Sequence, residues 1–224
     1  MSEYFNFNKL FDICNYIFSF LILNLLFMLL NLPAIFFILF VGISNIFNYF
    51  PLFLICLIPL MPAFNILVYC MSKCFKNKGF NLLKDFKKGF ILNFKQSLII
   101  WIFELIFIFV LYSNITFFKV AFNNTIISCI FLGLLILLLL MTPFISLLIS
   151  LFSNTSLNVI KNALVLTFTK PLLTLTNILV LLVALVLFEI SPGTIFLFIG
   201  SLISFLFVWA NRSLINELQA GSHN

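Results

Sequence analysis

Long apolar stretches separated by short polar segments are the dominant pattern of this chain. A membrane-spanning helix needs about 20 apolar residues to cross a hydrocarbon core about 30 Å thick. Six stretches come close to that length, at residues 13–30, 51–71, 98–118, 126–150, 172–190 and 194–210. The pattern therefore predicts an all-α fold, a polytopic membrane bundle of about six transmembrane helices that forms one membrane domain over residues 1–224.

Residues 32–50 fit this pattern least well. Asn31-Leu32-Pro33 predicts a break, because proline lacks the helical N–H and its ring clashes with the preceding turn. Two alternatives stay open for the apolar residues that follow. They prolong the first helix past the bilayer, or they form a re-entrant or interfacial segment. We do not expect a seventh full span, because it would reverse every later span.

Prolines and turn residues predict how the later spans are shaped. Ser191-Pro192-Gly193 predicts a tight turn that makes the last two spans an antiparallel hairpin. Pro59 and Pro62 interrupt the second span, and Pro143 interrupts the fourth. Each frees a backbone carbonyl and bends a helix, which is tolerated where protein or a cavity satisfies that carbonyl. A substrate path and simple packing are equally good explanations of these prolines.

Charged residues are too few to cover a soluble globule. They make up 8% of the chain, whereas soluble domains carry about 25%. The net charge of +6 comes from 12 basic and 6 acidic residues. The lysines alternate with the apolar stretches, so we expect them to contact the anionic lipids of the inner leaflet and not a nucleic acid.

The basic residues also predict the orientation. Seven lysines fall between the second and third spans, and cytoplasmic loops carry the Lys/Arg excess. With six spans and both termini in the cytoplasm, Lys9, Lys161, Lys170 and Arg212 also lie inside, and only Lys119 lies outside.

Both predicted cytoplasmic loops contain an amphipathic pattern. In the first, Leu82, Phe86, Phe90 and Phe94 recur every fourth residue, which predicts a helix of about 15 residues lying on the inner leaflet or under the bundle. In the second, an apolar stripe is formed by Leu157, Ile160, Leu164 and Phe168. The candidate residues for binding lipid or a partner are Lys84, Phe86, Lys87, Lys88, Phe90, Phe94 and Lys161. The alternative, which we favour, is a lipid-facing elbow that leads into the next span.

Glu104 is the candidate for intramembrane chemistry. It lies nine residues after Lys95, which places it about 14 Å further along a helix, near the bilayer midplane. A carboxylate at that depth binds a cation, carries a proton or pairs with a partner. The alternative is a protonated carboxyl that is hydrogen-bonded to an asparagine or serine of a neighbouring span, with Asn24, Asn65 and Asn177 as candidate neighbours. Glu104 and Asn65 form the candidate intramembrane polar site.

Enzyme chemistry finds no support in the sequence. It contains no glycine-rich phosphate loop, no nucleophile elbow and no metal-ligand spacing, and its one histidine is His223. We therefore expect no catalytic residues, no metal and no cofactor.

Three stretches resemble the YesL-like integral membrane proteins, a bacterial family of unknown function. The first is Asn24-Leu25-Leu26-Phe27 with the later Leu32-Pro33. The second runs from Pro62 to Leu67 and continues from Phe86 to Gln96. The third begins at Ile160-Lys161-Asn162-Ala163-Leu164 and continues to Leu175. The chain departs from the family at Met61, where a glycine is usual, and in its inner loop, where phenylalanine replaces tryptophan.

The resemblance implies a non-enzymatic accessory or assembly component of the bacterial cell membrane. Such proteins are associated with carbohydrate importers of the ATP-binding-cassette (ABC) type, so the expected partners are importer permease subunits. The alternative function is a small solute transporter or substrate-binding membrane subunit that uses Glu104.

Overall fold

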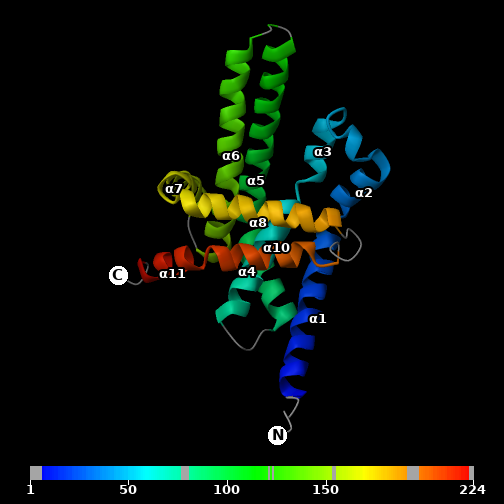
Figure 1. Cartoon of the computed structure of the whole chain (residues 1–224), viewed down its shortest axis with the longest axis vertical. Coiled ribbons are helices and arrows are strands. Elements are labelled where there is room, and N and C mark those ends of the chain that lie inside the picture. The colour runs from blue at the N-terminus through cyan, green and yellow to red at the C-terminus, as the bar shows by residue number, and fades with distance from the viewer. Residues whose placement is uncertain are drawn as a thin grey trace.

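The computed structural model describes residues 7–76, 81–120, 122, 124–152, 155–190 and 197–221. It is 91% helical and contains no strand within these ranges, which confirms the predicted all-α class. Figure 1 shows the helices in chain order. They are α1 (Phe7–Leu30), α2 (Leu32–Val41), the 3-10 turn η1 (Ile43–Asn45), α3 (Phe50–Cys56), α4 (Leu60–Lys76), α5 (Leu82–Val120), α6 (Thr125–Leu151), α7 (Ser156–Thr169), α8 (Pro171–Ile190), α10 (Ile199–Ala210) and α11 (Arg212–Gly221).

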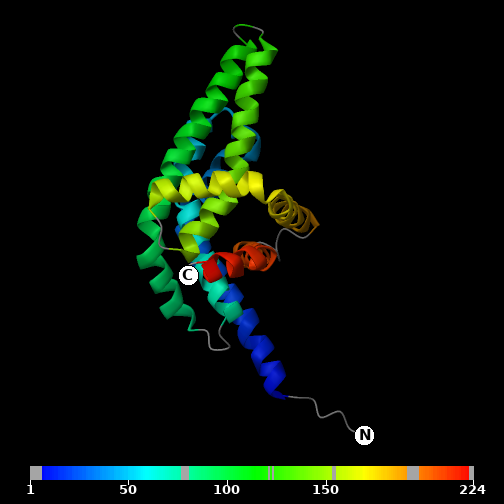
Figure 2. The same ribbon diagram turned by 90° about the vertical axis from the view of Figure 1, so that its left-hand side faces the viewer.

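The two longest helices, α5 and α6, form an antiparallel hairpin whose tip projects from the rest of the molecule (Figure 1, Figure 2). α5 has 39 residues and α6 has 27, so α5 is about 58 Å long, close to twice the thickness of a hydrocarbon core. Asn124 caps α6, because its side-chain oxygen accepts a hydrogen bond from the Ile127 amide at 3.3 Å. The predicted spans at 98–118 and 126–150 lie within these two helices.

The first predicted cytoplasmic helix is part of α5. Residues 82–94 are helical, but they continue into the apolar part of α5 without a break, so the expected separate helix and elbow are wrong. The fully buried face at this end is formed by the small or polar residues Gly89, Asn93 and Ser97. A Cβ atom at Gly89 would lie 2.9 Å from Tyr69 Cδ1. Glycine therefore lets α4 and α5 approach closely, which the phenylalanine spacing did not reveal.

Residues 32–56 turn back on themselves. α1 and α2 meet at 69°, which confirms the break predicted at Asn31 and rules out a straight continuation of the first helix. Gly42 follows α2 with a φ of 83°, a conformation that favours glycine. α3 then packs beside α2, with the rings of Phe37 and Phe53 5.2 Å apart. A broken span or a re-entrant segment both fit this geometry.

The second predicted span is split near Pro59. α3 ends at Cys56 and α4 begins at Leu60, and Phe50–Phe75 together are apolar and long enough to cross a membrane. Pro62 lies in the first turn of α4, where a missing N–H costs little. The Trp101 indole donates a 2.8 Å hydrogen bond to the Leu57 carbonyl. This contact gives the Leu57 carbonyl a second donor beside the Leu60 amide, from within the protein.

The last helices lie across the hairpin. In Figure 1, α8 and α10 run crosswise to α5 and α6, and Figure 2 shows both nearly end-on. α7 and α8 meet at 98°. α10 packs against α1, α4 and α8, and its 12 residues span only about 18 Å. The predicted turn Ser191-Pro192-Gly193 lies outside the described residues.

By length and composition, three helices of the described chain can cross a membrane, or up to five if each bent pair is one span. The main core is centred on α4, where Ile66, Leu67, Val68 and Cys70 have no exposed surface, and it reaches Phe144 in α6. Large apolar side chains are exposed along much of the surface, including the outer faces of α5 and α8, which is typical of a surface that contacts lipid or a partner.

Candidate functional site

Glu104 is buried in the structure, as the sequence predicted for an intramembrane carboxyl. It lies in α5 with 6% of its surface exposed. Its Oε1 atom is fully enclosed and has no hydrogen-bond partner. A buried carboxylate without a partner carries a large desolvation cost. Glu104 is therefore the residue of the described chain whose burial most needs a chemical explanation.

Glu104 lines a small cavity between α4, α5 and α6, which we call the acidic cavity. Its volume is about 10 Å³, close to the smallest space that holds one water. The lining residues are Met61 and Asn65 from α4, Ser97, Ile100, Trp101 and Glu104 from α5, and Ile145, Ser146 and Ile149 from α6. Each contributing helix belongs to a segment that is long and apolar enough to span a membrane, namely Phe50–Phe75 for α4, α5 itself and α6 itself.

Asn65 is the polar residue that α4 contributes to this cavity. Its side-chain amide donates a 2.6 Å hydrogen bond to Ser97 Oγ, and its backbone carbonyl accepts one of 3.0 Å from Ser150 Oγ. Its Oδ1 atom is buried without a partner. The acidic cavity thus has two unpartnered acceptor oxygens, one from Asn65 and one from Glu104.

The serines of α6 tie the site to the rest of the bundle. Ser146 Oγ donates to Met61 Sδ at 3.6 Å, and Ser150 Oγ lies 2.6 Å from the Ser146 carbonyl. The Asn93 amide reaches the Ser150 carbonyl at 3.5 Å. Sequence reasoning missed Ser97, Ser146 and Ser150. The signal was present, since Asn93 and Ser97, like Ser146 and Ser150, are four residues apart and share a helix face.

The other predicted neighbours of Glu104 lie elsewhere. Asn24 Oδ1 accepts a 2.8 Å hydrogen bond from the Gly200 amide at the start of α10. The Asn211 amide donates a 2.6 Å hydrogen bond to Asn177 Oδ1 at the end of α10. We call these two pairs the amide contacts of α10. Of the three asparagines considered, only Asn65 therefore shares a cavity with Glu104.

The predicted lipid- or partner-binding residues occupy two separate elements. In α5, the side chains of Lys84, Lys87, Lys88 and Phe90 are exposed, whereas Phe86 and Phe94 are half-buried against the main core. Phe90 stacks on Phe94 with ring centroids 4.4 Å apart. Lys161 is exposed on α7.

α7 packs on the bundle through small side chains and exposes the predicted apolar stripe. Its buried residues are Val159, Ala163 and Thr167. The predicted stripe of Leu157, Ile160, Leu164 and Phe168 is exposed, with Leu157 at 81% and Phe168 at 65%. The small side chains of the buried stripe let α7 lie close to the bundle, and the large apolar ones face outward.

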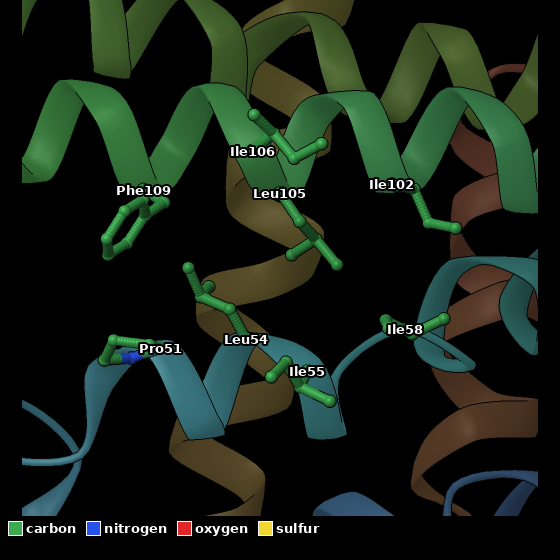
Figure 3. A pocket seen from close by; sticks show the side chains of 8 residues that line it. All are labelled: Pro51, Leu54, Ile55, Ile58, Ile102, Leu105, Ile106 and Phe109. Carbon is green, nitrogen blue, oxygen red and sulfur yellow. The ribbon is translucent and has the colours of Figure 1, made fainter.

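Two larger clefts are almost wholly apolar. The first, of about 240 Å³, lies between α3 and α5. Figure 3 shows Leu54 and Ile55 of α3 facing Leu105 and Phe109 of α5 across it. The second, of about 290 Å³, lies between α6 and α8 and is bordered by Pro143. Neither cleft contains a charged side chain, so the acidic cavity is the better candidate for chemistry.

Residues 20–115 of the chain, less than half of its length, match the family model described as a protein of unknown function, DUF624. The matched part includes α4 and most of α5, and with them Asn65 and Glu104, but not α6 or α7. Two of the three stretches that resemble a bacterial family of unknown function lie within it, and the stretch at 160–175 lies outside. No curated protein and no solved structure matches the chain significantly.

Proposed function

We propose that this chain is a multi-pass protein of the bacterial cell membrane, of the YesL-like type, that acts as a non-enzymatic accessory or assembly component of a carbohydrate ABC importer. The match to a family of unknown function and the resemblance of three sequence stretches support this proposal. Three to five helical units with the length and apolarity of spans support the membrane location.

The observation that carries the accessory role is the outward apolar face of α7. Leu157, Leu164 and Phe168 are exposed there beside Lys161. An exposed apolar patch flanked by basic residues is typical of a surface that binds a partner or the inner leaflet. Permease subunits and anionic lipids are the proposed partners of this face and of Lys84, Lys87 and Lys88 on α5.

The proposed topology has six spans with both termini in the cytoplasm. Eleven of the 12 basic residues then lie inside, which supports it. α8 and α10 cross the α5–α6 hairpin in Figure 1, so this topology requires both helices to turn toward the direction of α5 and α6 in the bilayer.

Gentle purification from native membranes tests the accessory role. We expect importer subunits to copurify with the wild-type chain and with a Leu179→Ala/Leu182→Ala control, in which two exposed apolar side chains of α8 are shortened. Leu157→Ala/Phe168→Ala should lose them, because it removes the exposed face of α7. If no importer subunit copurifies with the wild type, in detergent that preserves known importer complexes, the proposal is wrong.

A second function, a small solute carrier, is favoured by one observation. Glu104 is buried at the junction of three candidate spans with an unpartnered oxygen. Glu104→Gln should then abolish solute or ion uptake into liposomes that contain the purified chain. Equal uptake by the variant and the wild type would remove Glu104 from any transport mechanism.

A further inference from the structure

Two acceptor oxygens without partners line one small cavity. Glu104 Oε1 and Asn65 Oδ1 are both buried without a partner, and their residues, from different helices, line the same 10 Å³ space. Glu104 is 6% exposed and Asn65 is 1% exposed. Buried polar atoms in folded proteins nearly always have partners. A single occupant of the cavity that interacts with both oxygens would satisfy them together.

Two serines that line the same cavity, Ser97 and Ser146, offer further oxygen ligands. Ser97 Oγ accepts a hydrogen bond from the Asn65 amide, and Ser146 Oγ donates one to Met61 Sδ. A hydroxyl oxygen has two lone pairs, so each retains at least one for another ligand. The acidic cavity thus gathers four side-chain oxygens, from three helices, that can face one positive ion.

Charge decides what kind of ion fits. Among the described residues that line the cavity, Glu104 is the only one with an ionisable side chain. A single carboxylate is neutralised by a single positive charge, and a buried charge is tolerated when it is paired. Divalent Mg²⁺ keeps several waters, and Ca²⁺ takes six to eight oxygen ligands, which a cavity of this size does not supply.

We propose that α4, α5 and α6 hold one monovalent alkali cation, such as Na⁺, in the acidic cavity. Glu104 supplies the negative charge, and Asn65, Ser97 and Ser146 supply neutral oxygen ligands. A hard cation prefers such oxygens. The alternative occupant is a water beside a protonated Glu104, which requires two species, a proton and a water. A single cation both neutralises the carboxylate and contacts the neutral oxygens.

This site joins the three candidate spans that contain α4, α5 and α6, so the cation stabilises their packing. The inference does not depend on an importer partner. It adds a ligand class to the solute-carrier alternative. If the cation binds but is not transported, the proposed binding site is still correct and the proposed carrier function is wrong.

Binding of radiolabelled Na⁺ to the purified full-length chain tests the proposal, with choline chloride to hold ionic strength constant. We expect saturable binding of one ion per chain in wild type and in Glu189→Gln, which makes the same chemical change at an exposed position of α8. Glu104→Gln should bind none. Na⁺ should also raise the melting temperature of the wild type by about 5 °C at 100 times its dissociation constant.

Ser146→Ala provides a second variant in case Glu104→Gln does not fold. It removes one oxygen ligand and should weaken Na⁺ binding about tenfold. Equal binding by Glu104→Gln and wild type, or unchanged affinity in Ser146→Ala, would overturn the assignment. So would a wild type that binds no Na⁺, K⁺ or Li⁺ and is stabilised by mild acidification alone, because a proton would then be the occupant.

Discussion

The acidic cavity and the amide contacts of α10 both bury polar groups between helices, but they differ in charge. In the amide contacts, neutral groups meet directly at 2.6 and 2.8 Å. Asn177 Nδ2 and Asn211 Oδ1 remain unpartnered there. Each lacks one hydrogen bond, which costs less free energy than a buried unpaired charge. In the acidic cavity, a carboxyl has an unpartnered oxygen beside a small space.

This difference separates a structural contact from a candidate site. Polar side chains between membrane helices commonly act as links between them, and the amide contacts fasten α10 to α1 and α8 in this way. An ionisable residue held in the same kind of position indicates function. Substitutions should therefore affect the two regions differently.

The largest effect is expected at Gly200. A Cβ atom there would lie 2.7 Å from Phe27 Cδ1 and 3.0 Å from Asn24 Oδ1, so Gly200→Ala should cost about 2 kcal/mol in the free energy of unfolding. Gly133, in α6, has nothing within 4 Å of such an atom. Gly133→Ala should instead stabilise by about 1 kcal/mol, because alanine favours a helix. Denaturant unfolding in detergent measures both variants. A change in the free energy of unfolding of the same sign in both would contradict the close contact at Gly200.

A smaller effect on the free energy of unfolding is expected when one polar side chain is replaced. The replacement should destabilise the protein at the amide contacts of α10 but not at the acidic cavity. Asn211→Ala leaves Asn177 Oδ1 buried without its donor and should cost about 1.5 kcal/mol. Glu104→Gln, measured without alkali cations, should be neutral or stabilising, because it removes a buried charge while keeping the side-chain shape. A larger loss from Glu104→Gln than from Asn211→Ala in such buffer would make Glu104 a structural residue.

The smallest effect is expected at the break before α4. Trp101→Phe removes the hydrogen bond to the Leu57 carbonyl and should cost about 1 kcal/mol. Trp209 is 62% exposed on α10, so Trp209→Phe should change stability by less than about 0.5 kcal/mol. The comparison uses the two tryptophans of the chain in the same unfolding assay. Equal stabilities of the two variants would mean that the Trp101 hydrogen bond does not stabilise the break before α4.

The sequence was sufficient to predict the all-α class and the break at Asn31, and it singled out Glu104 with Asn65 among three candidate neighbours. These features follow from local rules, since apolar length, proline and an isolated carboxyl each have direct structural consequences. The packed faces of α5 and α7 were not predicted. Apolar residues lie on more than one side of a lipid-facing helix, so large side chains do not mark the packed face.

The packed faces are instead marked by small and polar residues, such as Gly89 and Ser97 in α5 and Ala163 in α7. The continuity of α5 was also missed, because no proline or glycine pair separates its basic and apolar parts, and a charge change alone does not end a helix. The crosswise placement of α8 and α10 depends on long-range packing that no local pattern encodes.

Cysteine labelling at the two ends of α5 tests most directly the claim that this chain spans a membrane. Lys87 and Lys119 lie 32 residues apart on this one helix, or about 48 Å, which exceeds the thickness of the hydrocarbon core. In a chain without its native cysteines, an impermeant maleimide should label Lys119→Cys on intact cells and Lys87→Cys only after permeabilisation. Labelling of both positions from the same side would contradict the account.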